Sequence, residues 1–228
     1  MTILEALLEL CKRTINDSND WYSWRKINEK KLPSGITLPR GNHYEQNVYL
    51  KRALRNKWVK SDEAGKVEIV RYYISTWGGI HKNSEETIQR YSNATPENLI
   101  ALGIQGVASW SKALCVYNPI EYAIFDARVS ASVNSLQIIY GINSPSLYPV
   151  LSSRNKTIVK ANSVFKQKAR LEGWTKKAES EYYSDYLNLL KSVKNNLNGR
   201  GVEIYTIEML LFSKAEELIK KAFPSEKF

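Results

Sequence analysis

The stretch that decides the fold lies within residues 95–117 and includes Leu99-Ile-Ala-Leu-Gly-Ile-Gln-Gly-Val-Ala-Ser-Trp-Ser-Lys112. Thr95 followed by Pro96 is typical of a helix start, because threonine caps the first turn and proline fits its first position. Two glycines then enclose an apolar residue, and helical spacing resumes after the second glycine. The stretch therefore predicts two helices joined by a tight glycine turn, which spans residues 103–106.

Helical spacing also covers most of the remaining chain. Apolar residues recur at helical intervals in residues 2–15, 44–60, 67–77, 120–140, 156–171, 180–197 and 203–223, and a further helix start lies at residues 83–86. The β-branched residues of 67–77 also favour a strand, but no partner strand is predicted nearby, so we interpret this segment as a helix. The sequence predicts an all-α fold in which residues 1–228 form one compact helical unit or two lobes.

Positive charge is concentrated in two parts of the chain. The formal net charge is +10, and residues 1–60 hold 12 Lys and Arg against 6 Asp and Glu, while residues 156–200 hold 10 against 4. The segment between them is close to neutral. Such a surface attracts a polyanion, and we expect double-stranded DNA to be the partner. The alternative is a solvated lysine-rich surface that only keeps the protein soluble.

Several classes of protein are not indicated by the sequence. Cys11 and Cys115 are far apart, and His43 and His81 lack metal-ligand spacing, so we expect no disulfide framework, zinc site or iron–sulfur cluster. We predict no membrane association, no cofactor and no obligate protein partner. Acidic residues interrupt the apolar N-terminal run, unlike a signal peptide, so a cytoplasmic, nucleoid-associated protein is expected.

Two residues near the glycine turn are candidates for chemistry. Asp126 lies in the apolar run Tyr-Ala-Ile-Phe-Asp-Ala-Arg-Val, where a carboxylate is costly unless it is paired or used. It either caps a helix or pairs with Arg128, or it is held beside a reacting centre. Lys112 lies fourteen residues earlier and could be a phosphate contact, a surface charge or an amine nucleophile.

This combination resembles the helix-hairpin-helix DNA glycosylases, most closely the bacterial relatives of 8-oxoguanine glycosylase. The resemblance covers residues 95–135, with a fainter similarity in Ile207-Glu-Met-Leu-Leu-Phe near the C-terminus. The family turn usually reads Leu-Pro-Gly-Val-Gly, whereas this chain lacks the proline and has Ala108 in place of the second glycine. Trp110 occupies the position of the family's catalytic lysine. The match at Asp126 is therefore firmer than the match at Lys112.

The resemblance implies a multi-helix glycosylase-like fold with a helix-hairpin-helix motif and particular roles for its residues. Asp126 and Lys112 would be catalytic, and the lysine would add weak cleavage of the strand at abasic sites. The DNA backbone would be contacted by Gly103, Gln105, Gly106, Ala108, Ser109 and Arg128. The flipped base would stack on side chains among Trp77, Trp110, Tyr122 and Phe125, although each of these could simply pack in a core.

Three hypotheses follow from these residues. The first is a DNA glycosylase that excises an oxidised purine or a phage-type hypermodified base. The second is a non-catalytic helix-hairpin-helix protein that only binds DNA. The third is a nuclease or a phage-interaction protein with an unrelated helical fold, but the acidic cluster that would hold a divalent ion is not evident.

Overall fold

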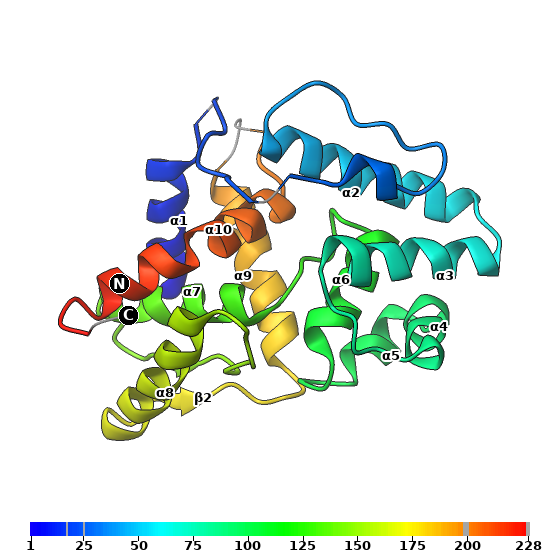
Figure 1. Cartoon of the computed structure of the whole chain (residues 1–228). Helices are drawn as coiled ribbons and strands as arrows, with labels where there is room; N and C mark the ends of the chain where they lie inside the picture. The colour runs from blue at the N-terminus through cyan, green and yellow to red at the C-terminus, as the bar shows by residue number, and fades with distance from the viewer. Residues whose placement is uncertain (17, 25, 198–200, 227–228) are drawn as a thin grey trace. The chain divides into compact units, whose positions relative to one another are not determined.

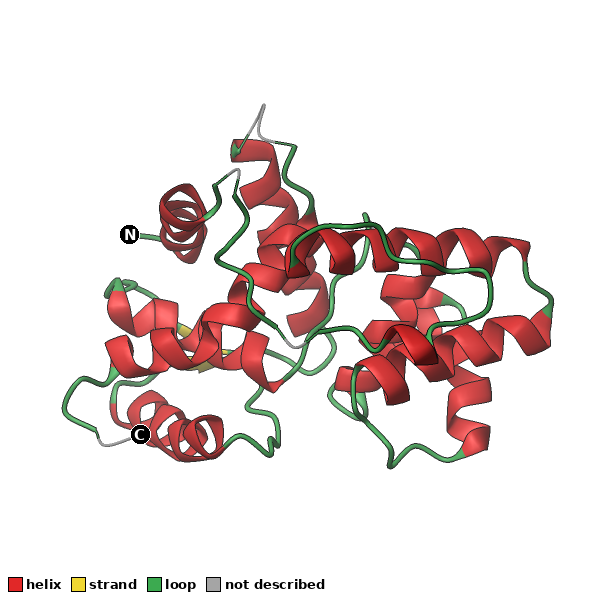
Figure 2. Cartoon of the chain, turned by 45° about the horizontal axis from the view of Figure 1, so that its top comes forward, coloured by secondary structure: helices red, strands yellow, loops and turns green. Residues whose placement is uncertain are grey.

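The protein is almost entirely helical. The computed structural model describes residues 1–16, 18–24, 26–197 and 201–226. In this part of the chain, ten α-helices, one 3-10 helix, one π-helix and two two-residue strands make up the regular structure (Figure 1, Figure 2). The predicted all-α class is confirmed. No described helix is both long enough and apolar enough to cross a membrane.

The helices divide between two compact units. Unit 1 comprises Met1–Ile15 and Phe125–Phe228, and unit 2 comprises Asn16–Ile124. Unit 1 contains α1 (Ile3–Thr14), α7 (Ala127–Ile139), β1 (Ser146–Leu147), α8 (Lys156–Leu171), β2 (Thr175–Lys176), α9 (Tyr182–Asn196) and α10 (Ile204–Ala222). Unit 2 contains η1 (Glu29–Lys31), α2 (His43–Lys60), α3 (Glu63–Arg71), η2 (Tyr72–Trp77), α4 (Glu85–Asn93), α5 (Pro96–Ile100) and α6 (Val107–Tyr117).

Local capping explains where several helices begin. Thr95 caps α5 through its side chain with Pro96 in the first turn, as the sequence predicts. Ser84 accepts a hydrogen bond from the Thr87 amide at the start of α4. At the start of α2, Asn42 and Glu45 form a capping box in which each side chain accepts from the other's backbone amide. Such caps satisfy amides that a helix leaves unbonded at its first turn.

The predicted helix at 67–77 is two elements. Residues Glu63–Arg71 form α3, which begins four residues earlier than predicted because Asp62 caps it. The chain then widens into a π-helix at Tyr72–Trp77. A π-helix inserts one extra residue per turn and redirects the side chains that follow, and such turns are frequent at functional sites. The apolar spacing of the sequence did not reveal this change.

The prediction of one helix over residues 120–140 is wrong in its first third. The helix α7 begins only at Ala127, and the residues from Asn118 to Asp126 form turns and extended chain. Asn118 and Pro119 end α6, and Asp126 adopts an extended backbone as the cap of the next helix. Ala123, Ile124 and Phe125, directly before Asp126, are buried although they are not helical, which is why their spacing was misleading.

The core of unit 1 forms around α7, which packs closely against α10. A cluster of buried residues joins α7, α8, α10 and the segments around β1 and β2. Its members are Ala131, Leu147, Ile158, Ala161, Phe165, Ala169, Trp174, Ile219, Ala222 and Phe223. This burial gives α7 a fixed position within unit 1, and with it the residue that caps its start.

Polar side chains inside unit 1 hold the strand β1 against α7. Asn134 exchanges two hydrogen bonds with the backbone of Tyr148, at 3.0 and 3.2 Å. Gln137 does the same with Ser146, at 2.8 and 2.9 Å. The strand β1 pairs with β2 in the described two-stranded sheet. The side-chain amides of Asn134 and Gln137 supply hydrogen-bond partners for backbone groups of Ser146 and Tyr148.

Candidate functional site

The glycine turn predicted from the sequence joins α5 to α6 in unit 2. Gly103 and Gly106 have φ values of 58° and 73°, in the left-handed region that favours glycine. A Cβ atom at Gly106 would also clash with the hydroxyl group of Tyr91. The indole N–H of Trp110 donates to the carbonyl of Gln105 at 3.1 Å, so the turn is fixed from inside.

The helix α6 begins without a side-chain cap. Its N-cap residue is Gly106, which has no side chain to accept from the first turn. Ser109 is buried, and its hydroxyl accepts from the Asn83 amide at 2.9 Å instead of pointing outward. Gln105 and Gly106 are exposed, whereas Ala108 is half-buried. The amides of Val107 and Ser109 donate to the carbonyls of Ile104 and Gly106, so an anion such as a phosphate group would be received by the amides of Gly106 and Ala108.

Lys112 lies one and a half turns into α6 and is buried. Only 4% of the residue is exposed, and its Nζ donates to the carbonyl of Ala108 at 2.6 Å. Its stem lies against Gly78, because a Cβ atom built there would come within 2.7 Å of the Lys112 Cε. Gly78 directly follows Trp77 and the π-helix. The structure thus places the candidate amine beside the end of that element.

Asp126 lies in unit 1 and caps α7. Its carboxylate accepts from the backbone amides of Arg128 and Val129, at 2.9 and 3.1 Å. The Arg128 side chain turns away toward α10, where it donates to the Phe212 carbonyl and pairs with Glu216 at 2.9 Å. Of the roles left open for Asp126, helix capping is the one seen, and Arg128 contributes its amide to the cap. The guanidinium of Arg128 ties α7 to α10 in this arrangement.

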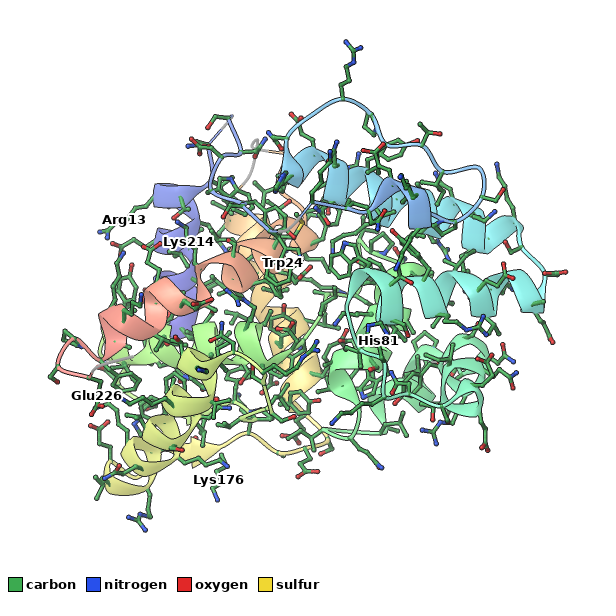
Figure 3. All side chains as sticks on the ribbon, viewed as in Figure 1. Arg13, Trp24, His81, Lys176, Lys214 and Glu226 are labelled. Atoms are coloured by element: carbon green, nitrogen blue, oxygen red, sulfur yellow. The ribbon has the colours of Figure 1, made fainter. Side chains whose placement is uncertain are left out.

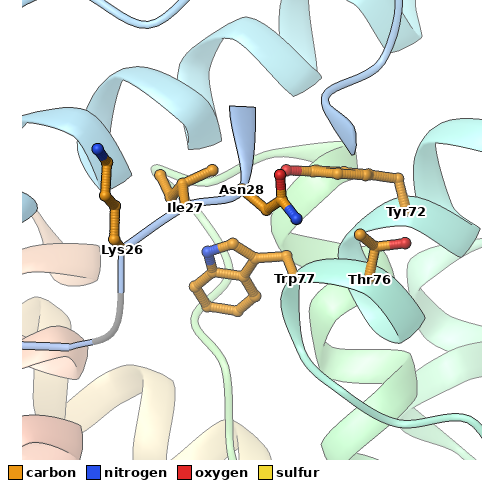
Figure 4. A pocket seen from close by; sticks show the side chains of 6 residues that line it. All are labelled: Lys26, Ile27, Asn28, Tyr72, Thr76 and Trp77. Carbon is orange, nitrogen blue, oxygen red and sulfur yellow. The ribbon is translucent and has the colours of Figure 1, made fainter. Parts of the chain in front are cut away.

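Trp77 is the aromatic candidate that walls a described pocket near Lys112. A cavity of about 140 Å³ lies between the chain before η1 and the π-helix, lined by Lys26, Ile27, Asn28, Tyr72, Thr76 and Trp77 (Figure 4). The Trp77 indole N–H donates to Asn47 at 2.9 Å, and its ring stacks on Tyr73 with centroids 4.4 Å apart. Burial raises the pKa of Tyr72 to about 12, so its phenol stays protonated at neutral pH.

The other three aromatic candidates have different positions. Trp110 is fully buried in unit 2, where its indole supports the glycine turn. Phe125 is fully buried in unit 1 among Tyr148, Tyr182 and Tyr186. Tyr122 is half-buried and lines a second cavity of unit 2. Trp110 and Phe125 therefore pack in the cores of their units, which was the simpler alternative for each aromatic candidate.

Sequence reasoning missed a buried lysine in α2. The basic segment of residues 1–60 is predicted to form a charged surface, but Lys51 within it is only 2% exposed, and its Nζ lies 5.7 Å from the ring centroids of both Tyr73 and Trp77. A signal was present in the sequence. Lys51 shares the helical stripe of Asn47, Leu50 and Leu54, all of which are buried. It therefore supports the stacked aromatic pair behind the cavity and is not part of a basic surface.

Exposed basic residues remain in both units. In unit 1, Lys156, Lys166 and Arg170 are exposed on α8, and the side chains of Arg13 and Lys176 extend outward from the ribbon (Figure 3). Part of the charge is compensated locally, because Lys168 pairs with Glu172 and Lys160 with Glu226. The surface of α8 therefore retains a net positive charge that could attract a polyanion.

Neither a metal cluster nor a known relative identifies the site. Within the described residues, no group of three or more histidine, cysteine, aspartate or glutamate side chains is placed to hold a metal ion. Comparison of the chain with models of protein families, with curated proteins and with solved structures finds no match. Function must therefore be inferred from the residues and their geometry.

Proposed function

We propose that this protein is a DNA glycosylase of the helix-hairpin-helix type, which flips a damaged or modified base out of duplex DNA and excises it. One observation carries the proposal. Lys112 is buried on the helix that starts at the glycine turn, and its stem packs against Gly78, which directly follows Trp77, a residue that lines a cavity of the same unit. A DNA-binding turn, a reactive side chain and a stacking surface would thus share unit 2.

The cavity beside Trp77 has the chemistry to accept part of a flipped base. Its volume of about 140 Å³ is close to the roughly 150 Å³ of a cavity that holds one benzene molecule, so it would enclose one six-membered ring of the base. Trp77 offers a ring face for stacking, while Asn28, Thr76 and Tyr72 offer polar atoms to the edge of a base. An oxidised purine or a hypermodified base carries added polar groups of the kind that such atoms can recognise.

Asp126 lies in unit 1 and Lys112 in unit 2, so a chemical role is proposed for each by itself. Breaking the N-glycosidic bond builds positive charge on the sugar, which the Asp126 carboxylate would stabilise while it orients an attacking water molecule. In the lyase reaction the Lys112 amine would attack the sugar C1′, and the base would leave with the electron pair of the N-glycosidic bond and take up a proton. The sugar ring would then open to an imine, and elimination of the 3′-phosphate would break the strand. Lys112 would first have to release the carbonyl of Ala108.

Backbone contacts would hold the duplex without reading its sequence. Gly103 is buried, and the amides of Gly103 and Gln105 donate to Ile100 and Leu102 within the turn. A phosphate contact would therefore use the amides of Gly106 and Ala108 at the start of α6. Exposed lysines of α8 would add a salt-dependent attraction. Weaker binding at higher salt is therefore expected for every duplex, including duplexes that carry no modified base.

The test is an excision assay on a panel of duplexes that bear oxidised, deaminated, alkylated and phage-type modified bases. Hot alkali then breaks the strand at each abasic site. Asp126→Asn removes the carboxylate, and Asp62→Asn is the matched control, because Asp62 caps α3 in the same way. Breaks that require alkali, made by the wild type and by Asp62→Asn but not by Asp126→Asn, would support a glycosylase and identify its base.

Lyase chemistry is tested separately in the same assay. Strand breaks before alkali, and a protein–DNA adduct trapped by borohydride, are expected to disappear in Lys112→Met. Methionine keeps the apolar stem of the buried side chain while it removes the amine. An adduct that persists in Lys112→Met would assign the nucleophile to another residue and would remove Lys112 from the mechanism.

A non-catalytic DNA-binding protein is the second candidate. It is favoured by the contacts that Asp126 and Lys112 already make, since a helix cap and a carbonyl contact give both residues structural roles. This function predicts salt-dependent binding to every duplex and unchanged DNA after incubation. Tight binding without any product from the whole panel would favour it over the glycosylase.

A further inference from the structure

A second cavity of unit 2 lies at the end of α6 opposite the glycine turn. Its volume is about 480 Å³, and its walls come from the ends of α2 and α6, the first part of α3, the connection from α4 to α5 and the segment after α6. The helix α6 has 11 residues, which corresponds to a length of about 16 Å. The cavity is therefore separate from the turn and from the cavity beside Trp77.

Three aromatic side chains form one wall of this cavity. Trp58 and Tyr117 meet edge to face with centroids 5.3 Å apart, and Tyr122 lies 6.2 Å from Tyr117. Tyr117 is 37% exposed, unusually open for an aromatic residue that contacts two other rings. Arg55 and Lys66 lie over these rings, with the Lys66 Nζ 4.7 Å from the Trp58 centroid. Since cations already cover Trp58, a cationic ligand is disfavoured.

Polar groups in this region lack the partners that burial requires. Ser92 lines the cavity and is only 6% exposed, yet its hydroxyl has no hydrogen-bond partner among the described residues. The Nη1 of Arg55, behind the aromatic wall, is also buried without one. Buried polar groups are almost always satisfied in folded proteins, so unsatisfied ones indicate a missing partner. A ligand with an acceptor oxygen would supply the partner for Ser92.

Charges at the rim limit what the ligand can be. Glu63 and Glu97 are exposed and line the cavity, against one lysine, Lys66. Two carboxylates disfavour a phosphate group, but each can accept from an amino group. Burial, and then the charge of Glu97, raises the pKa of Tyr122, so that its phenol stays protonated at neutral pH. The cavity thus offers donors, acceptors and stacking faces, with little affinity for a strongly charged ligand.

We propose that this cavity is a binding site for an uncharged, planar heterocycle with both carbonyl and amino groups, namely the nucleobase of a free nucleoside. The ring stacks on Tyr117 and meets Tyr122 edge to face, because the two tyrosine rings are inclined by 61°. Its carbonyl oxygen accepts from Ser92, and its amino group donates to Glu97. Guanine carries both kinds of group on one edge, which makes guanosine the suitable probe. The proposal does not depend on the glycosylase function, because no DNA is needed for it.

The test measures guanosine binding to the full-length protein by saturation-transfer NMR and by calorimetry. Tyr117→Leu is expected to abolish the saturation transfer. The matched control is Tyr49→Leu, which removes a similarly exposed tyrosine (41%) from α2 outside this lining. Glu97→Gln, a change at an exposed position, is expected to weaken guanosine binding severalfold without affecting the fold. Guanosine monophosphate should bind roughly tenfold more weakly than guanosine because of the rim carboxylates.

The outcomes separate clearly. Binding that is lost in Tyr117→Leu, retained in Tyr49→Leu and weakened in Glu97→Gln supports the site. No binding of millimolar guanosine to the folded wild type overturns it, as does equal binding by wild type and Glu97→Gln. Tighter binding of the monophosphate, or binding only of single-stranded DNA, also overturns it, because the ligand would then be recognised through phosphate.

Discussion

The helices α6 and α7 begin in opposite ways, although both carry a residue proposed for chemistry. The helix α6 starts at a left-handed glycine without a side-chain cap, and its candidate, Lys112, lies buried further along. The helix α7 starts at an extended aspartate whose carboxylate accepts two backbone amides. At α6 the amides of Val107 and Ser109 donate to backbone carbonyls of the glycine turn, whereas at α7 the first-turn amides donate to a side-chain carboxylate.

Under the proposed glycosylase function, the two helix starts would have distinct tasks. A helix start without a side-chain cap attracts an anion through the partial positive charge of the helix dipole, so α6 would contact the DNA backbone. A capped start holds its carboxylate in one orientation, so α7 suits a fixed negative charge beside a reacting sugar. The comparison fails if changes at Gly106 leave DNA binding intact, or if the charge of Asp126 proves irrelevant to base release.

The largest expected effect comes from the charge of Asp126. Asparagine is as good a cap as aspartate, so Asp126→Asn should keep α7 intact. The rate of base release should nevertheless fall by about 100-fold to 10,000-fold, the range found for positioned acid–base groups. Single-turnover kinetics on the substrate identified in the panel measures this fall. A loss below about fivefold would reduce Asp126 to a structural cap.

The next effect concerns the turn before α6. Gly106→Ala should destabilise the protein by about 3 kcal/mol, because alanine is strained at positive φ and its Cβ meets the Tyr91 hydroxyl. Gly141→Ala is the matched control, with φ at 57° and nothing within 4 Å of the added Cβ. It should cost only about 1 kcal/mol. Denaturant unfolding measures both values.

The contribution of the clash can be isolated. Tyr91→Phe removes the hydroxyl group that the new Cβ of Gly106→Ala would meet, so the double variant should recover part of the lost stability. It should not recover DNA binding if the turn conformation itself presents the amides. Complete recovery of both properties would show that the left-handed conformation of Gly106 has no role of its own.

Capping and helical spacing explain how much of the fold the sequence predicts. Thr95 and Ser84 were recognisable as caps, because a small polar residue before an acidic first turn has few other uses. The start of α7 was missed because the buried residues before Asp126 are as apolar as a helix stripe. Periodicity reports burial, and a buried extended segment can imitate a helix over a few residues.

The candidate sites were predicted less well, because pockets depend on side chains from distant segments. Trp77 was one of four equivalent aromatic candidates until the chain before η1 placed Asn28 beside it. Lys51 was read as a surface charge, since lysine is rarely buried. The aromatic wall of the second cavity combines Trp58 with Tyr117, residues separated by most of unit 2. A local sequence pattern cannot predict a contact between two side chains that are so far apart in the sequence.

A smaller effect tests the cap of α7 alone. Asp126→Ala removes both acceptor bonds to the amides of Arg128 and Val129, whereas Asp126→Asn keeps an acceptor. Loss of an N-cap should lower the free energy of unfolding by about 1 kcal/mol relative to Asp126→Asn. Both variants should be equally inactive. Equal stability of the two would mean that the cap contributes little and that the carboxylate is placed by other contacts.

The smallest expected effect is on the stability of the protein at high pH, to which one buried tyrosine in each unit contributes. Burial raises the pKa of Tyr72 to about 12 in unit 2, and burial followed by Asp185 raises that of Tyr148 in unit 1. The folded state then holds protons that the unfolded chain releases above pH 10, so each tyrosine contributes stability below pH 10 that is lost between about pH 10 and 12. Tyr72→Phe and Tyr148→Phe should each make this alkaline loss of stability shallower, by at most about 1.4 kcal/mol per pH unit.

Of these two variants, only Tyr72→Phe should also weaken base release, because Tyr72 lines the cavity beside Trp77 and Tyr148 does not. An equal effect of Tyr148→Phe on base release would place the base elsewhere.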